Sequence, residues 1–411
     1  MGVHEGRNQA EIAVLPPRFG PLGVTRLALT DFRNYRAERL DLAAGRSLLP
    51  VVVLTGPNGA GKTNLLEAVS VLSPGRGLRN ARLADLDRRP ANDDEAAAPG
   101  ATGGWAVAAT IETRRGAVRI GTGRDPTGGE RRIVRIDGEN VRGQAVLGEV
   151  IGVTWLTPQM DRLFIEGPSA RRRFLDRLVL GLDPAHATRV SAYEHAMRER
   201  SRLLRPADRD GAADPAWLDA VEETMAAQGV AVAAARRDAV ERLDAACAAT
   251  EGPFPRAALA LAGTVEAWLD ELPALAAEDR LRASLRDSRA VDALTGGAAV
   301  GPHRSDLAVT HAERGVPAES MSTGEQKALL ISIVLAHARL QRQTRGEAPL
   351  LLLDEVAAHL DATRRDALFA ALLGLESQVW LTGTDAALFA PLRDCARFLS
   401  VSDGTLSETM S

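Results

Sequence analysis

Eight consecutive residues place a lysine and a threonine directly after a glycine-rich turn. The run GPNGAGKT has the spacing G-x-x-x-x-G-K-[ST] and stands between an apolar β-branched run and a helical pattern. Glycines let the backbone approach phosphate oxygens, and free N–H groups at a helix start bind anions. We therefore expect a phosphate-binding loop in which Lys62 contacts the β- and γ-phosphates of ATP and the Thr63 hydroxyl holds Mg²⁺. The residues expected around the phosphates are Gly56, Pro57, Asn58, Gly59, Ala60, Gly61, Lys62, Thr63 and Asn64.

Two acids close a second apolar run, LLLLDEV, which spans Leu350 to Val356. Carboxylates at the end of a buried strand are costly unless a cation or a reacting water uses them. We expect Asp354 to hold the water shell of Mg²⁺ and Glu355 to polarise the attacking water as a general base. The alternative is a strand that simply ends at solvent, and the phosphate-binding run weakens that alternative.

A third run, MSTGEQKALL, lies roughly 260 residues after Lys62 and contains no nucleophile or catalytic pair. It opens a helical pattern, so Ser322 and Gly324 are expected at a helix N-terminus, where free N–H groups and the helix dipole favour an anion. The alternative is an ordinary helix cap. The other two runs favour a second phosphate contact.

Composition limits the classes of protein. The 411 residues, of which 45% are hydrophobic, are enough for two or three packed units. The two cysteines lack metal-ligand spacing, and no apolar run approaches the roughly 20 residues that span a bilayer. We expect a cytoplasmic protein without a membrane anchor. The net charge of −4 argues against a generally basic coat, so any nucleic-acid contact must be a local patch.

The apolar patterns predict an α/β fold at both ends of the chain. Alternation and turn signals indicate an edge strand at 24–35, an antiparallel meander over 105–141 and a buried strand in VIGVTWLTP. The strand before the phosphate loop continues into a helix that contains Leu65 and Leu66. After GGAAVGPHRSDL the patterns predict a helix from Gly324 to about Arg342, the strand PLLLLDEV, the helix TRRDALFAALLGL and a last strand, QVWLTGTD.

Between about residues 185 and 289, Ala, Arg, Glu and Leu recur at helical spacing and interrupt the α/β pattern. Two helices joined by the polar linker RPADRDGAADP are expected there, followed by the apolar segment AALALAG and another helix. The acidic and glycine-rich stretch 92–104 is expected to be a flexible surface loop. We divide the chain into a flexible tail (1–23), a first ATPase part (24–184), an inserted helical arm (185–290) and a second ATPase part (291–411).

Seven motifs in order, LTDFRNY, GPNGAGKTNLLEA, SPGRGLR, GPSARRRFLD, GPHRSD, STGEQKALL and LLLDEVAAHLD, extend over almost all of 24–385. With them the chain resembles the ABC-type ATPases and, among these, the RecF family related to the SMC proteins. GPSARRRFLD and GPHRSD are not general ATPase features, which makes the resemblance specific. It implies a P-loop ATPase head with an antiparallel β subdomain and an inserted, mainly helical arm.

The resemblance also implies roles for single residues. Arg33 and Asn34 match residues that approach the nucleotide in relatives, although a solvated strand end remains the alternative. Gln159 is similar to the glutamine that senses Mg²⁺ and the γ-phosphate, and Asp361 resembles an acid that bridges two subunits. Ser322 and Gly324 would complete the nucleotide site of a partner subunit.

One feature of transporter ATPases is missing from the run WLTGTD, where a switch histidine would be expected. Thr382 or Thr384 would take its place. We therefore expect a weak ATPase, in which slow hydrolysis acts as a switch.

Three arginine groups are candidates for DNA contacts, since arginine binds phosphate through a bidentate fork. The segment 114–142 contains eight arginines and only four acidic residues. The second group is the run Arg171 to Arg173 at a predicted helix start, and the third group is Arg76, Arg79 and Arg82. The alternative is a solvated face with internal ion pairs. Arg171 to Arg173 are equally compatible with anchoring the signature helix.

By resemblance we expect an ATP-dependent DNA-binding protein that dimerises on ATP, binds gapped duplex or single-strand DNA, and helps RecR, with RecO, to load RecA. Three alternatives belong to other classes. A transporter ATPase subunit would carry its signature only about 100 residues after the phosphate loop, an SMC-like DNA bridge would need longer arm helices, and a nuclease of the related ATPase class would need an appended acidic domain.

Overall fold

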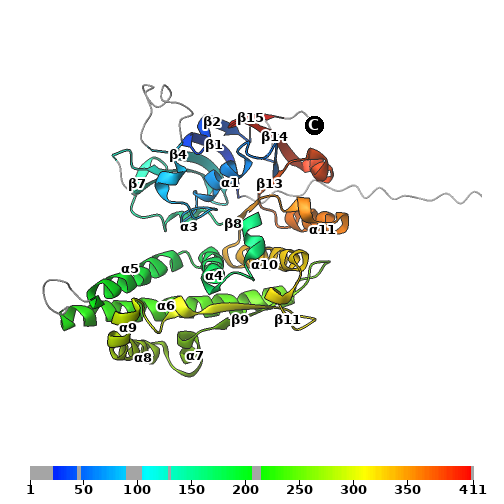
Figure 1. The fold of residues 1–411 in the computed structure, drawn as a ribbon. Helices are drawn as coiled ribbons and strands as arrows, with labels where there is room; N and C mark the ends of the chain where they lie inside the picture. The colour runs from blue at the N-terminus through cyan, green and yellow to red at the C-terminus, as the bar shows by residue number, and fades with distance from the viewer. Residues whose placement is uncertain (1–21, 44–47, 89–103, 128–130, 206–213, 409–411) are drawn as a thin grey trace, which may run out of the picture.

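A computed structural model describes residues 22–43, 48–88, 104–127, 131–205 and 214–408 (Figure 1). Two sheets and their helices form an upper lobe, and long helices form a lower body, with α4 and α10 between them. The tail predicted for 1–23 and the surface loop predicted for 92–104 lie outside the described residues, apart from Leu22, Gly23 and Gly104. Within the described ranges, no helix has the length and hydropathy that a membrane span requires.

The central sheet has six strands in the order β15-β14-β3-β13-β12-β8. All neighbouring pairs are parallel except β14 and β15. Every residue of β3, β8, β12 and β13 is buried, as expected for strands covered on both faces. The carboxyl ends of these strands therefore meet at one edge. The strands span Thr405–Glu408 (β15), Ala396–Ser402 (β14), Val51–Thr55 (β3), Val379–Gly383 (β13), Leu350–Leu353 (β12) and Val153–Leu156 (β8).

The prediction that QVWLTGTD is the last strand was wrong. β14 and β15 follow it and form a hairpin, with Asp403 and Gly404 at φ 45° and 75° in the turn. An Asp-Gly pair with two positive φ angles is the turn that suits a two-residue hairpin. β14 pairs with β3, and the Gly404 N–H donates to the Ala60 carbonyl, so this hairpin supports the glycine-rich loop.

The second sheet is antiparallel and confirms the predicted meander, with the strand order β2-β1-β4-β5-β6-β7. Its first strand ends at Phe32, because Arg33 adopts a φ of 56° and the chain turns back into β2. Helix α1 shares one hydrophobic core with both sheets, including Leu65, Val107 and Trp380. The elements span Tyr35–Asp41 (β2), Gly23–Phe32 (β1), Ala106–Thr113 (β4), Gly116–Arg124 (β5), Arg132–Ile136 (β6), Glu139–Val141 (β7) and Lys62–Ser70 (α1).

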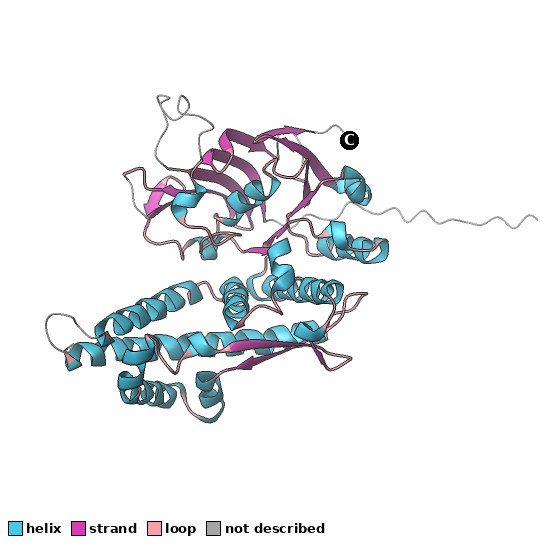
Figure 2. Cartoon of the chain, in the orientation of Figure 1, coloured by secondary structure: helices cyan, strands magenta, loops and turns pink. Residues whose placement is uncertain are grey.

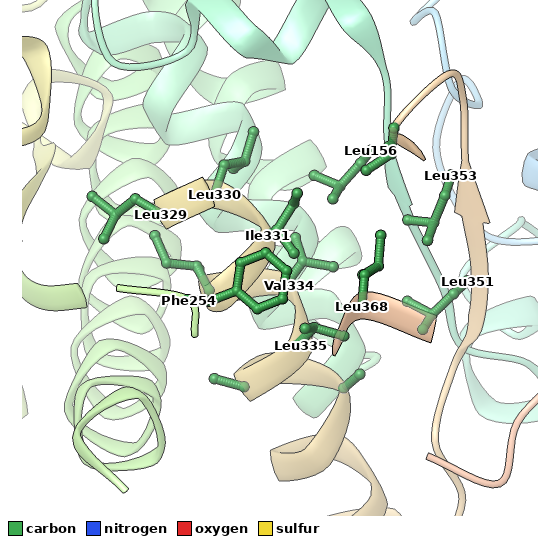
Figure 3. Close-up of a cluster of buried hydrophobic side chains, with 14 of the residues drawn as sticks. Leu156, Phe254, Leu329, Leu330, Ile331, Val334, Leu335, Leu351, Leu353 and Leu368 are labelled. Atoms are coloured by element: carbon green, nitrogen blue, oxygen red, sulfur yellow. The ribbon is translucent and has the colours of Figure 1, made fainter. Parts of the chain in front are cut away.

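The other face of the central sheet packs on α10, a buried helix of 23 residues spanning Thr323–Arg345. Figure 3 shows Leu330, Ile331 and Val334 of α10 in one hydrophobic cluster with Leu351 and Leu353 of β12. The helix predicted from Gly324 to about Arg342 is confirmed. Helices α4 (Pro168–Leu182) and α11 (Ala362–Leu373) complete this core.

The lower body is mainly helical (Figure 2) and has its own core around Tyr193, Met225 and Leu281. The apolar segment AALALAG forms β9, which pairs with β10, and β10 pairs with β11. One small sheet thus joins residues on both sides of the predicted boundary at 290. The elements span His186–Leu204 (α5), Pro215–Ala248 (α6), Ala257–Ala262 (β9), Thr264–Glu271 (α7), Ala274–Asp287 (α8), Arg289–Thr295 (α9), Asp306–His311 (β10) and Val316–Pro317 (β11).

Short helices lie in the connections. The α-helical turn α3 spans Leu147–Val150, and the 3₁₀ segments span Leu83–Leu86 (η1), Pro158–Arg162 (η2), Pro302–Arg304 (η3), Ala318–Ser320 (η4), Ala357–His359 (η5) and Ala386–Cys395 (η6). Three of them, η2, η5 and η6, follow the central strands β8, β12 and β13 at their carboxyl ends.

Candidate nucleotide-binding site

The glycine-rich loop connects the carboxyl end of β3 to the start of α1. A Cβ on Gly56 would lie 2.2 Å from the Val401 carbonyl oxygen, and one on Gly61 would lie 2.6 Å from the Asn34 amide nitrogen. Both positions also have a positive φ, so a side chain is excluded. The buried Lys62 ammonium donates to the carbonyls of Gly56 and Pro57 at 2.7 and 2.9 Å. The cation is therefore held over the loop in which the sequence predicts phosphates.

Thr63 and Asp354 meet at the edge of the sheet, as the sequence predicts. The Thr63 hydroxyl donates to the two Asp354 carboxylate oxygens at 3.1 and 3.0 Å. Hydroxyl and carboxylate oxygens are ligands that suit Mg²⁺. The described residues hold no group of three or more His, Cys, Asp or Glu side chains placed to bind a metal. A Mg²⁺ ion here would therefore need phosphate oxygens and waters to complete its shell.

A buried threonine of β13 connects the two acids. The Thr382 hydroxyl donates to Asp354 at 2.7 Å and accepts the backbone N–H of Glu355 at 2.9 Å. Glu355 has a φ of 54°, which costs a residue other than glycine about 1–3 kcal/mol and is typical of functional sites. Of the two threonines that the sequence offered, Thr384 is exposed and Thr382 holds the acids.

Replacing Thr382 by valine is expected to lower the free energy of unfolding by about 1–3 kcal/mol, because a buried carboxylate and a backbone N–H both lose a partner. Denaturant unfolding followed by circular dichroism measures the change. Thr382→Ser retains the hydroxyl and should keep most of the stability. Thr384→Val removes an exposed hydroxyl and is the matched control. Equal stability of the Thr382→Val and Thr384→Val variants would contradict this role.

The residues after β1 hold the loop and helix from the side. The Asn34 amide donates to the Ala60 carbonyl at 3.1 Å and accepts from the Asn64 amide at 2.7 Å. Tyr35, which the sequence analysis missed, donates its hydroxyl to the Gly61 carbonyl at 3.0 Å. Burial raises the pKa of Tyr35 well above its usual value, so this hydroxyl stays a donor. Asn34 thus contacts the phosphate loop, and its predicted approach to the nucleotide stays a prediction.

Arg33 points to α1 instead of the loop. It donates two N–H bonds to the carboxylate of Glu67, at 2.8 and 2.9 Å, and a third to the Asp85 carbonyl. Glu67 is fully buried and also pairs with Arg79 at 3.1 Å. The arginine therefore neutralises a buried acid, and its predicted approach to the nucleotide stays a prediction.

Gln159 and Asp361 lie in segments that follow strands of the same edge. Gln159 is an exposed residue of η2, directly after β8. Asp361 is exposed at the N-cap of α11, where its carboxylate accepts the Arg364 N–H at 2.8 Å. Their predicted roles at the nucleotide site stay predictions.

Ser322 begins α10 with a capping box. Its hydroxyl accepts the Glu325 N–H at 3.4 Å, and the Glu325 carboxylate accepts the Ser322 N–H at 3.0 Å. The Ser322 N–H, the Ser322 hydroxyl and Arg314 together lower the pKa of Glu325 to about 2. Ser322 and Gly324 are exposed, and a Cβ on Gly324 would touch nothing within 4 Å. Ser322 is therefore a helix cap on a surface open to another molecule.

The arginine run at the start of α4 joins two motifs of the sequence. Arg171 donates two N–H bonds to Asp306 at 2.7 and 2.8 Å, and Arg172 donates to the Ser305 carbonyl at 2.8 Å. These contacts anchor α4 to the start of β10, and not to the signature helix α10. Because the guanidinium groups of Arg171 and Arg172 are hydrogen-bonded within the chain, they support the alternative of internal ion pairs over DNA contact.

Comparison with known proteins agrees with this geometry. The family model RecF/RecN/SMC N terminal domain matches residues 23–406. The DNA replication and repair protein RecF of Mesorhizobium japonicum is 50% identical over 390 residues, covering 94% of this chain and 98% of the relative. The protein of the same name from Rhizobium meliloti is 49% identical over 394 residues, covering 93% and 98%.

Solved structures share the fold. The recombination mediator protein RecF-ATP in the RecFOR pathway superposes with a TM-score of 0.79 at 20% identity, covering 95% of this chain and 99% of that one. The Smc head domain of Pyrococcus furiosus superposes with a TM-score of 0.50 at 16% identity, covering 94% and 96%. The fold is that of an ABC-type ATPase head, as predicted. From its motifs, its near-full-length relatives and its fold, the chain belongs to the RecF family.

Proposed function

We propose that this protein is an ATP-dependent DNA-binding protein of recombinational repair and replication-fork maintenance. One observation carries the nucleotide part of the proposal. Thr63 and Asp354 are 291 residues apart in the chain, and the fold brings their side chains to 3.0 Å beside Lys62. A lysine, a hydroxyl and a carboxylate at the mouth of a glycine loop are the groups that bind a nucleoside triphosphate with Mg²⁺.

ATP and Mg²⁺ fit the site. Lys62 and the loop N–H groups would hold the phosphates, and Thr63 with Asp354 would hold Mg²⁺, with Gln159 near its shell. Glu355 would orient and deprotonate the attacking water. ATP hydrolysis would be weak and would act as a switch for dimerisation and DNA binding.

The signature run supports a site shared by two subunits. Among the hydrogen bonds of the described residues, Ser322 bonds Glu325 and none joins it to the phosphate loop. Its helix N-terminus is exposed and suited to an anion. ATP bound at Lys62 would be completed by Ser322 of the partner subunit and Gly324 of the partner subunit, with Asp361 across the contact. ATP would thus join two copies head to tail.

The DNA and partner parts rest on the relatives. Those of about 50% identity are named for DNA replication and repair, and a structural neighbour of 20% identity is named a recombination mediator of the RecFOR pathway. We propose that the ATP-bound dimer closes on gapped duplex or single-strand DNA in the cytoplasm and, with RecR and RecO, helps to load RecA. The relatives' names support neither the transporter nor the nuclease alternative.

The direct test of this proposal is the affinity of the protein for gapped DNA with and without ATP. ATP binding should raise that affinity or lower its salt sensitivity, because two DNA-contacting surfaces would act together. Equal affinity for DNA with and without ATP would contradict the proposal that an ATP-bound dimer closes on DNA.

A further inference from the structure

An arginine-lined hollow of about 610 Å³ lies at the antiparallel sheet and is lined by residues outside the phosphate loop. The segment after α1, the start of β6 and the turn after β7 form its walls. The side chains around it are Arg76, Arg82, Leu83, Arg131, Arg132 and Gln144. Four of these are arginines and none is acidic, in a chain whose net charge is −4. The hollow therefore concentrates positive charge that the chain as a whole does not have.

Arg132 forms the fixed part of the hollow. Its guanidinium donates to the Gly75 carbonyl at 2.8 Å, to Gln144 at 2.7 Å and to the Thr122 hydroxyl at 2.7 Å, and it also contacts the Val71 carbonyl. All these acceptors are neutral. Burial lowers the pKa of Arg132 to about 10, so the group is still charged at neutral pH. A half-buried cation with neutral partners attracts an anion.

The other three arginines remain at the rim. Arg76, Arg82 and Arg131 are exposed, and the side chains of Arg76 and Arg82 form no hydrogen bond or ion pair with any described residue. Arg131 lies near Asp125, whose carboxylate is already bonded by Thr127 at 2.6 Å. Their planar forks are therefore available for a ligand that offers paired oxygens.

We propose that this arginine-lined hollow binds a phosphate group of a nucleic-acid strand. The inference deepens the proposed DNA-binding function and rests on it. A cluster of guanidinium groups matches phosphate oxygens in charge and geometry, and such backbone contacts fix a strand's position without reading its sequence. The phosphate belongs to the strand itself, either within it or at its end.

The same segment also contacts the nucleotide site. Arg79, between Arg76 and Arg82, donates to the side-chain Oδ1 of Asn64 at 2.6 Å. The Asn64 side-chain amide donates to Oδ1 of Asn34, and the Asn34 side-chain amide donates to the Ala60 backbone carbonyl. One wall of the hollow is thereby tied through side chains to the phosphate loop. This contact places the hollow beside the part of the molecule that ATP would order.

The test uses the full chain and a labelled duplex with a single-strand overhang, titrated by fluorescence anisotropy at several salt concentrations. The variant Arg76→Ala/Arg82→Ala/Arg131→Ala should bind at least about tenfold more weakly, and the slope of log K against log salt should fall by about one, since each phosphate contact contributes about 0.9. The control Arg26→Ala/Arg36→Ala/Arg39→Ala removes three exposed arginines of β1 and β2, outside the candidate groups, and should bind DNA like the wild type. ATP binding should equal that of the wild type in both variants, which verifies folding.

Wild-type affinity and salt slope in the hollow variant, with DNA binding by the wild type intact, would overturn this inference and leave the proposed function standing. Absence of DNA binding by the wild type would instead remove the proposed function. Oligonucleotides with and without a 5′-phosphate distinguish a phosphate within the strand from a phosphate at its end. Equal weakening with both supports an internal phosphate, and weakening only with the phosphorylated strand supports a terminal one.

Discussion

Replacing Lys62 by alanine is expected to abolish the effect of ATP on DNA binding. The Lys62 ammonium lies on the carbonyls of Gly56 and Pro57, over the loop that would hold the phosphates. A hydrogen bond to a charged group contributes about 1.5–3 kcal/mol, so ATP affinity should fall by about 10- to 150-fold. Titration with a fluorescent ATP analogue measures this loss, and DNA anisotropy with and without ATP measures its consequence.

Arg36→Ala is the matched control, because it removes one exposed cation from the same lobe, on β2. It should leave both ATP affinity and the ATP effect unchanged. An ATP effect of wild-type size in the Lys62→Ala variant would show that the glycine loop is not the nucleotide site.

Replacing Glu355 by glutamine is expected to slow ATP turnover by about 10²- to 10⁴-fold, the usual contribution of a general base. Glutamine keeps the shape of the side chain, and the backbone N–H of residue 355 can still donate to Thr382. ATP binding should therefore survive, and the ATP-bound state should accumulate on DNA. Phosphate release in a single turnover measures the rate, and anisotropy measures DNA release.

Glu376→Gln offers a close control for this change. Glu376 also has a positive φ, 55°, but it lies after α11 and pairs with Arg342 at 2.6 Å. Turnover in this variant should match the wild type. If Glu355→Gln hydrolyses ATP as fast as Glu376→Gln, Glu355 is not the base.

The sequence predicted those parts of the fold that local patterns determine. Continuous apolar runs such as LLLL of β12 are buried on both faces, and the alternating run of β4 belongs to an antiparallel sheet. The glycine spacing predicted the loop, and Thr63 and Asp354, both predicted to serve one Mg²⁺ ion, lie within hydrogen-bond distance of each other. Each of these features follows from one short stretch of chain.

Features that depend on distant neighbours were missed. AALALAG is too short and uniform to distinguish a strand from a helix, and only pairing with β10 makes it β9. Gln378 bonds the backbone N–H and carbonyl of Val24, at 2.9 and 3.1 Å, and so ties β1 to the central sheet. No local pattern of QVWLTGTD reveals this contact or the bond from Thr382 to Asp354.

The sequence also does not show which arginines are paired with an acid in the fold. Arg171 and Arg132 look alike in a sequence rich in arginine, yet the first pairs with Asp306 and the second is bonded to neutral groups only. Which arginine has a counter-charge depends on which acids the fold brings near, so the sequence could name three candidate groups but could not choose among them.

Whether two subunits share one nucleotide site is tested by sedimentation of the wild type and of Ser322→Arg, each with and without ATP. An arginine at the exposed start of α10 would obstruct the partner's phosphates, whereas Ser191→Arg, on an exposed position of α5, should not. We expect a dimer that forms with ATP in the wild type and in Ser191→Arg and is lost in Ser322→Arg. A mass that is indifferent to both ATP and the Ser322 substitution would contradict it.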